Sequence, residues 1–179
     1  IKFYEEALGI LKQTLGENHP DVAVTLQNMG EASSNQGDYK KATAYYQEAL
    51  AILEQTLSDH HPTVAMALQN MGSTLLNQGD YDGALEYYQK ALVIYRQALG
   101  ESHPSVAMTL NNIGLVLKSR GDYKGATKNF EQALVIYKQT LGNSHPDVAQ
   151  TLDSMGDVLR IEGDYDGAIK YFEQALVIR

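Results

Sequence analysis

Histidine is the residue type in this sequence with the widest chemical repertoire, and four of the five histidines recur at intervals of 42 residues. They are His19, His61, His103 and His145, and each directly precedes a proline. Ligands that share a zinc ion lie about 2 Å from it, whereas equivalent positions on packed helices are at least about 8 Å apart. We therefore predict a structural role for them at corners of the fold, with no metal site and no cofactor.

The carboxylates that repeat with the same period are Asp38, Asp80, Asp122 and Asp164, each within a Gly-Asp-Tyr triplet. A carboxylate that recurs once in each copy is typical of a helix N-cap, whose side-chain oxygen accepts a hydrogen bond from a backbone N–H. The sequence has no cysteine and therefore no thiolate nucleophile. Since it also contains no phosphate-binding loop, nucleophile elbow or triad spacing, we predict that the chain is not an enzyme.

Each 42-residue copy has the hydrophobic pattern of two helices. In the first copy, apolar residues from Val22 onward follow the i, i+4, i+7 spacing of one buried helix face, and those from Ala42 onward do so again. Pro20 suits the first helical position, and Gly37 suits the left-handed position after the last. The turn between the helices is about two residues long, which predicts an antiparallel pair, helix A and helix B.

The predicted fold class is all-α, an α-solenoid of antiparallel helix pairs stacked in one domain over residues 1–179. Its parts are helix B of a truncated repeat (1–15), three full repeats (16–57, 58–99 and 100–141) and a last, truncated repeat (142–179).

Two positions inside helix A are unusual. Gly30 recurs in every copy although glycine there costs about 1 kcal/mol relative to alanine. We expect the bare Cα to let helix B approach, with Ala42 opposite and the Tyr46 ring beside that contact. Ser33 stands where the later copies have leucine, and it indicates either drift or a polar niche.

Several of these residues resemble the tetratricopeptide repeat signature, which normally has a period of 34 residues. They are the glycines at 30 and 37, the alanines at 42 and 49, and the aromatic ring at 46, while Leu26 replaces the family tryptophan. The period of 42 and the phrase L-G-x-x-H-P-x-V-A-x-T-L, at 15–26 and again at 141–152, are similar to the longer repeats of kinesin light chains. The resemblance implies a right-handed superhelix with A helices lining an inner, concave surface that binds segments of other proteins.

The helix A face opposite the core carries amides and methionines instead of charges. An amide donates and accepts hydrogen bonds, so a column at Asn28, Asn70 and Asn112 could pair with the backbone of an extended peptide. Kinesin light chains are similar in having asparagines at the matching positions against the bound peptide. The predicted peptide-binding residues are Asn28, Met66, Gln69, Asn70, Met108, Asn111, Asn112 and Leu115. The alternative is that these residues pack against the neighbouring A helix.

The fourth copy departs from this column, because Ser154 replaces the amide. The basic carboxylate clamp of chaperone-binding tetratricopeptide domains has no counterpart here, since no lysine or arginine stands at the matching positions. The nearest cations, Lys118 and Arg160, could receive an acidic side chain or could simply be solvated.

The charge and hydropathy of the chain limit its partners. A formal net charge of −8 disfavours nucleic acid, whose phosphates require Lys and Arg, and no apolar run approaches the 18 residues of a membrane span. We predict a scaffold, with a cytoplasmic location, that binds a peptide segment of a protein partner. The alternative is a structural spacer or an array that self-associates end to end through apolar terminal helices.

Overall fold

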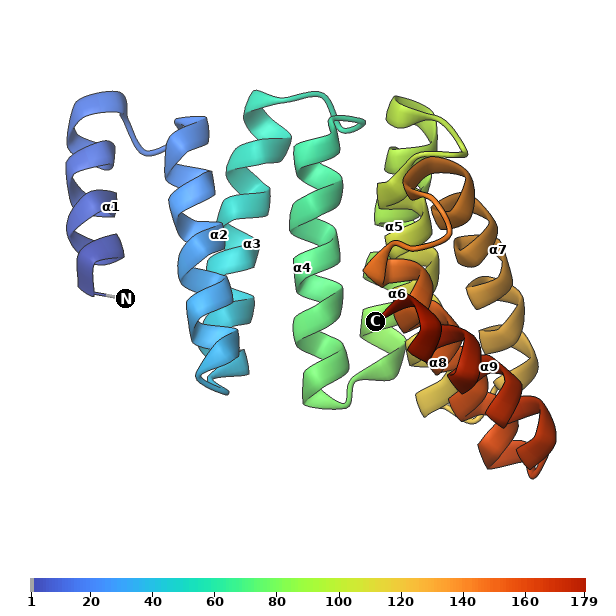
Figure 1. The fold of residues 1–179 in the computed structure, drawn as a ribbon. Helices are drawn as coiled ribbons and strands as arrows, with labels where there is room; N and C mark the ends of the chain where they lie inside the picture. Colours follow the sequence, from blue (N-terminus) through green and yellow to red (C-terminus); the bar gives the residue numbers. More distant parts are fainter. Residues whose placement is uncertain (1) are drawn as a thin grey trace. The chain divides into compact units, whose positions relative to one another are not determined.

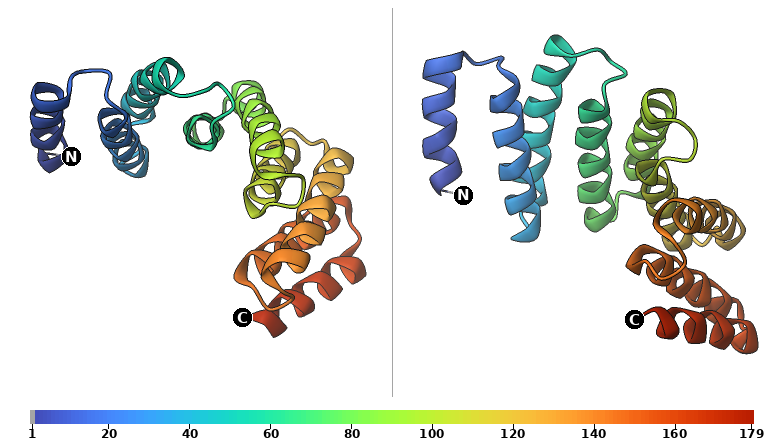
Figure 2. Two further views of the ribbon diagram at one scale, coloured as in Figure 1. Left: turned by 90° about the horizontal axis from the view of Figure 1, so that it is seen from above. Right: turned by 45° about the horizontal axis from the view of Figure 1, so that its top comes forward.

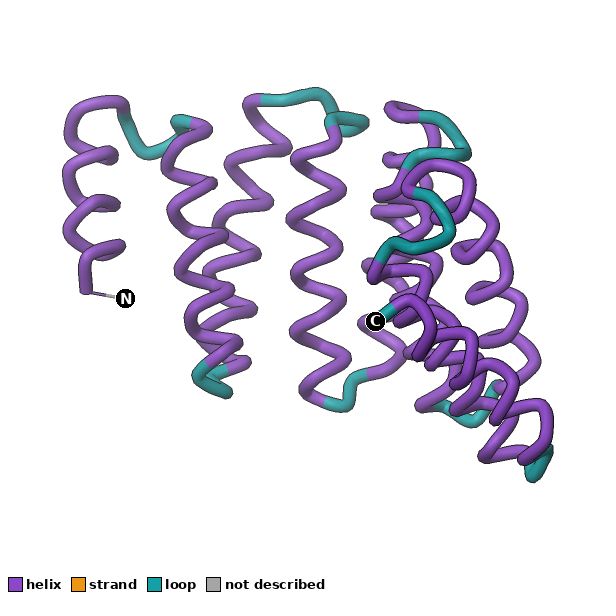
Figure 3. The backbone as a smooth tube through the Cα atoms, viewed as in Figure 1, coloured by secondary structure: helices purple, strands orange, loops and turns teal. Residues whose placement is uncertain are grey.

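The computed structural model describes residues 2–179, which form nine α-helices joined by short loops (Figures 1 and 3). In chain order the helices are α1 (Lys2–Leu15), α2 (Pro20–Asn35), α3 (Tyr39–Thr56), α4 (Pro62–Gln78), α5 (Tyr81–Leu99), α6 (Pro104–Ser119), α7 (Tyr123–Leu141), α8 (Pro146–Glu162) and α9 (Tyr165–Ile178). The even-numbered helices are the predicted A helices and the odd-numbered ones are the B helices. The predicted all-α class is confirmed for the described residues.

The chain divides into two compact units, Ile1–Ile94 and Tyr95–Arg179, which we call the N unit and the C unit. Within the N unit, α2 packs against α1, α3 and α4. Within the C unit, α6 packs against α7 and α8, and α8 packs against α9 (Figure 2). Each unit thus holds A helices beside one another, with a B helix against each A helix. The single domain over residues 1–179 stays a prediction.

The A helices begin as the sequence predicts, with proline in the first turn of α2, α4, α6 and α8. The histidine before each proline is the N-cap residue. In α2, the Nδ1 atom of His19 accepts a hydrogen bond from the backbone N–H of Asp21 at 3.2 Å, and the other three histidines do the same. An imidazole nitrogen can accept only when it carries no proton, so this capping arrangement requires an unprotonated Nδ1.

The B helices begin at the predicted aspartate caps. The Asp80 Oδ1 atom accepts from the backbone N–H of Gly83 at 3.0 Å, and Asp122 Oδ1 accepts from that of Gly125 at 2.9 Å. The helix before the cap ends in a left-handed glycine, for example Gly79 with φ +83°, as predicted. The Gly-Asp-Tyr triplet therefore ends one helix and begins the next.

One loop departs from the repeat. Gly16, Gly100 and Gly142 follow a B helix with a φ near +90°, but Ser58 stands at the equivalent position after α3. A side chain at positive φ is strained, and α3 ends at Thr56, one residue before the register at which α5 and α7 end. The loop with Ser58 in place of glycine therefore leaves its B helix one residue earlier than the equivalent loops do.

The recurring glycine inside each A helix lies against an aromatic ring. A Cβ atom added to Gly30 would lie 2.7 Å from Cε1 of Tyr46, and one added to Gly114 would lie 2.5 Å from Cε1 of Phe130. The expectation that alanine faces the glycine, with the ring beside it, was wrong, because the ring itself occupies the space over the bare Cα. Ala42 is fully buried nearby in the same core.

Candidate peptide-binding faces

In the N unit, the candidate face consists of Val24 and Asn28 on α2 and Met66 and Asn70 on α4, which we call the N-unit A face. In each helix the apolar residue precedes the asparagine by four positions, so the two lie on the same side of the helix. Val24 and Met66 are 44% and 43% exposed; Asn28 is exposed and Asn70 is half-buried. Within the described residues neither asparagine side chain forms a hydrogen bond, which leaves both amides available to a ligand.

The amides one position earlier have a different environment. Gln69 and Asn111, both predicted to bind peptide, are 8% and 7% exposed. The Asn111 Oδ1 atom accepts a hydrogen bond from Thr151 Oγ1 at 3.4 Å, which joins α6 to α8. The burial of these two residues favours the packing alternative for them, since one step along a helix turns a side chain by about 100° away from the exposed asparagine column.

Tyrosine hydroxyl groups of the B helices form hydrogen bonds with α4 in the N unit. Tyr88 Oη and Ser73 Oγ are 2.9 Å apart and form a hydrogen bond, and burial raises the pKa of Tyr88. The pKa of Tyr46 is raised to about 12, chiefly by burial and secondly by the charge of Glu31. A hydrogen bond with Thr74 acts in the opposite direction and lowers this pKa. Sequence reasoning missed this group; the signal was that Tyr88 occurs with Ser73 where the next copy has Phe130 with Leu115.

In the C unit, the corresponding residues on α6 are Met108 and Asn112. Met108 is 40% exposed and Asn112 is half-buried, and the Asn112 side chain forms no hydrogen bond within the described residues. Leu115, also predicted to bind peptide, packs partly against the buried cluster that contains Phe130 and Met155. It therefore contributes to the core as well as to the face.

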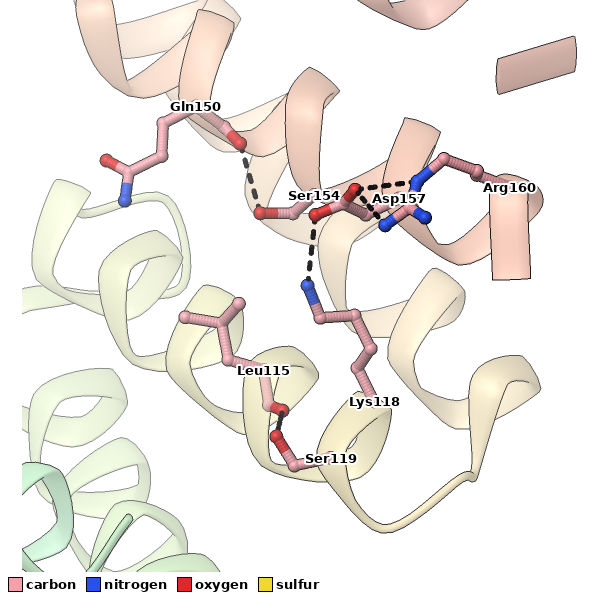
Figure 4. A network of polar contacts seen from close by, with 7 residues as sticks. All are labelled: Leu115, Lys118, Ser119, Gln150, Ser154, Asp157 and Arg160. Carbon is pink, nitrogen blue, oxygen red and sulfur yellow. Dashed lines mark hydrogen bonds and ion pairs between the residues drawn. The ribbon is translucent and has the colours of Figure 1, made fainter. Parts of the chain in front are cut away.

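On α8 a buried serine replaces the asparagine of the other A helices, and it is accompanied by paired charges (Figure 4). Ser154 is buried, and its hydroxyl donates to the backbone carbonyl of Gln150 at 3.1 Å. The Asp157 carboxylate pairs with Lys118 Nζ at 3.4 Å and with Arg160 Nη2 at 3.1 Å. The two cations considered as receptors for an acidic side chain therefore already share a carboxylate of this chain, and the asparagine column does not extend to α8.

Residues 2–179 contain no group of three or more histidine, cysteine or acidic residues that could hold a metal ion. Over the same range no helix has the length and apolar character required to cross a membrane.

Tandem helix pairs with these A-helix faces define the chain as an α-solenoid repeat protein. A family model described as Tetratricopeptide repeat matches residues 1–55, 33–96, 63–138 and 105–179. Because these matches span the chain, the protein belongs to the tetratricopeptide repeat family. The predicted tetratricopeptide repeat array is thus confirmed, and kinesin light chain-like repeat proteins are among the solved structures that resemble it.

Three solved structures illustrate the relationship. The chain is similar to BtubC (BKLC) from P. vanneervenii at 28% identity and a TM-score of 0.87, covering 99% of this chain and 71% of that one. It is similar to a Podosopora anserina putative kinesin light chain with nearly identical TPR-like repeats at 21% identity and a TM-score of 0.80, covering 99% of this chain and 84% of that one. Aspartyl phosphate phosphatase F from Bacillus subtilis matches at 20% identity and a TM-score of 0.85, covering 99% and 44%. No curated protein matches the sequence.

Proposed function

We propose that this chain is a non-catalytic protein-interaction scaffold whose A-helix faces bind a peptide segment of a partner protein. Membership of the tetratricopeptide repeat family supports the general role in protein–protein interaction. The specific binding face is supported by the asparagines of the N-unit A face, whose amides have no hydrogen-bonding partner among the described residues.

The chemistry of this face suits the backbone of an extended peptide. A side-chain amide can accept from a peptide N–H and donate to a peptide C=O, so Asn28 and Asn70 can hold a backbone without reading its sequence. Val24 and Met66, one helical turn before the asparagines, offer apolar contacts to the side chains of the peptide.

The expected energies show why both kinds of contact are needed. A net hydrogen bond contributes about 0.5–1.5 kcal/mol, so two asparagines fall far short of the ~8 kcal/mol that corresponds to micromolar affinity. The apolar residues Val24 and Met66 must supply much of the remainder, and with it the preference for one peptide over another.

A peptide-display screen against the native protein, followed by titration of selected peptides, tests the proposal. We expect the Asn28→Ala/Asn70→Ala variant to bind selected peptides about tenfold more weakly. The matched control is Gln47→Ala/Gln89→Ala, which removes two exposed amides from the B helices of the same unit. Equal affinities for the native protein and the asparagine variant would place the site elsewhere.

A second candidate function, self-association, is favoured by exposed apolar side chains on α9. Tyr165, Ile169 and Leu176 are 65%, 52% and 73% exposed, and such a face can be covered by another copy of the chain. Light scattering over a concentration series separates the two candidates. A mass that grows with concentration favours an array, whereas a constant monomer mass favours the peptide-binding scaffold.

A further inference from the structure

A second surface of the N unit, none of whose lining residues was predicted to bind peptide, has the features of a docking site. In the N unit, α3, α4, α5 and the loop after α3 line a groove of about 480 Å³. Its apolar lining comes from Leu50, Val64, Leu68, Val93 and Ile94, and its polar rim from Glu54, Asp59, His60 and Lys90. Val93 is 52% exposed, so an apolar surface is open to solvent here.

The C unit has the equivalent groove 42 residues later in the chain, with a volume of about 500 Å³. Leu110, Val135 and Ile136 line it and correspond in the repeat to Leu68, Val93 and Ile94 of the first groove. The two grooves therefore share three apolar positions, and they differ in the charged residues beside these positions.

The rims differ in charge. In the C-unit groove, Arg96 Nε lies 2.9 Å from Glu101 Oε2, so the two residues form an ion pair within this chain. The angle at this contact is not that of a hydrogen bond, and the Arg96 Nε–H group has no hydrogen-bond partner among the described residues. The equivalent residues of the N-unit groove are Glu54 and Asp59. Two carboxylates cannot pair with each other, so this rim has no counterpart of the Arg96–Glu101 contact.

The lysine of the N-unit rim forms its ion pair with a carboxylate outside the groove lining. Lys90 also lines the groove, but its Nζ atom pairs with Glu86 Oε1 at 2.6 Å. Within residues 2–179, neither Glu54 nor Asp59 takes part in an ion pair. The N-unit groove thus combines an apolar lining with two rim carboxylates that form no ion pair, although Glu54 interacts electrostatically with Lys90.

We propose that the N-unit groove binds a segment of a partner protein in which an arginine is next to a large apolar residue. The arginine occupies, between Glu54 and Asp59, the place that Arg96 occupies beside Glu101 in the C unit. The apolar side chain enters the groove over Leu68 and Val93. Arginine suits the rim better than lysine, because its planar guanidinium can contact two carboxylates at once. This site goes beyond the function proposed above, since none of its lining residues belongs to the N-unit A face.

The first test uses a short capped peptide, Ac-Gly-Ser-Leu-Arg-Leu-Ser-Gly-NH2, titrated into the ¹⁵N-labelled protein at low salt and followed by NMR. We expect saturable shift changes centred on Leu68 and Val93, weakened by added salt because the contact is electrostatic at its rim. The same peptide with glutamine in place of arginine should bind at least fivefold more weakly. Equal binding of the two peptides would overturn the proposal.

The second test changes the protein. The variant Glu54→Arg recreates the C-unit ion pair in the N unit and should weaken binding of the arginine peptide at least fivefold. The control Glu17→Arg makes the same change of charge in the N unit away from the groove and should have little effect. Circular dichroism verifies that both variants fold. If Glu54→Arg and Glu17→Arg bind the arginine peptide with equal affinity, the groove is not the site. This holds whether both bind weakly or both bind as tightly as the native protein.

A third variant tests the gain of a site. Arg96→Glu gives the C-unit groove two carboxylates at its rim, so the arginine peptide should now also shift the resonances of Leu110 and Val135. A variant that folds but leaves these resonances unmoved would contradict the role assigned to the rim.

Discussion

The N unit and the C unit have the same helix pairs and the same caps, but they present different chemistry. The N unit has tyrosines at its glycine–ring contacts, asparagines without hydrogen-bond partners on the N-unit A face, and two carboxylates at the rim of the N-unit groove. The C unit places phenylalanines at the same contacts, and its charged residues pair with one another at Asp157 and between Arg96 and Glu101. The comparison shows that a constant backbone can carry very different surfaces.

The differences between the units are coupled for a physical reason. A buried tyrosine hydroxyl requires a hydrogen-bond partner, and Ser73 supplies one to Tyr88. Where the ring is Phe130, the residue equivalent to Ser73 is Leu115, which packs against the same cluster. Each unit therefore satisfies its own ring, and exchanging one residue of a pair without the other should be unfavourable.

The largest effect is expected at the glycine–ring contact of the C unit. Gly114→Leu places a branched side chain where a Cβ atom alone would lie 2.5 Å from the Phe130 ring. We expect a loss of about 3 kcal/mol in the free energy of unfolding, measured from urea unfolding.

The control for this change is Gly9→Ala in α1, where an added Cβ atom has no neighbour within 4 Å. It should be neutral or stabilising, because alanine is the better helix former. An unchanged urea midpoint for Gly114→Leu would refute the close contact.

The next largest effect tests the coupling of ring and partner. Phe130→Tyr adds a hydroxyl at a fully buried ring and should cost about 2 kcal/mol, because the new donor lacks a partner. Adding Leu115→Ser supplies the partner that Ser73 gives to Tyr88. A double-mutant cycle in urea should therefore show a favourable coupling energy, and additive losses would mean that the pairing of these residues is incidental.

Removal of an aspartate cap should destabilise the two units by the same amount. Asp80→Ala in the N unit and Asp122→Ala in the C unit each remove an acceptor about 3 Å from a backbone N–H. Each should cost about 1 kcal/mol, seen as a lower melting temperature by circular dichroism. If either variant melts like the native protein, that aspartate does not stabilise its helix.

The smallest effect concerns Ser33, a serine whose equivalents in the C unit are leucines. Ser33 is fully buried and its hydroxyl has no hydrogen-bond partner, whereas the later copies have leucine. Ser33→Ala removes the unpaired hydroxyl and should stabilise the protein by somewhat less than about 1 kcal/mol. Thermal unfolding measures this, with Ser34→Ala as the neighbouring control; a decrease in stability would indicate a polar niche that needs the hydroxyl.

Most of the fold was predictable from the sequence, because the signals for it are local. Apolar spacing, Pro20 and Gly37 specify helix boundaries through the chain's own backbone geometry, and the period of 42 repeats them. The histidine caps were missed, since histidine is not among the residues that usually cap helices, although its place before each proline was the signal.

The candidate sites were less predictable. Asn70 and Gln69 are adjacent amides, and the sequence predicts both for the face, yet only the packing of the helices buries Gln69 and leaves Asn70 half-exposed. The N-unit and C-unit grooves were not predicted at all, because residues from three helices and a loop line each one. No spacing along a single helix indicates such a cavity.

The sequence by itself determined where each helix begins and ends and that the helices recur in pairs, since those properties depend on interactions within a few residues. The tertiary structure decided which side chains are exposed, that an aromatic ring covers each buried glycine, and that Glu54 and Asp59 share a rim where Arg96 and Glu101 form an ion pair. These properties depend on distances between helices, and such distances follow from packing.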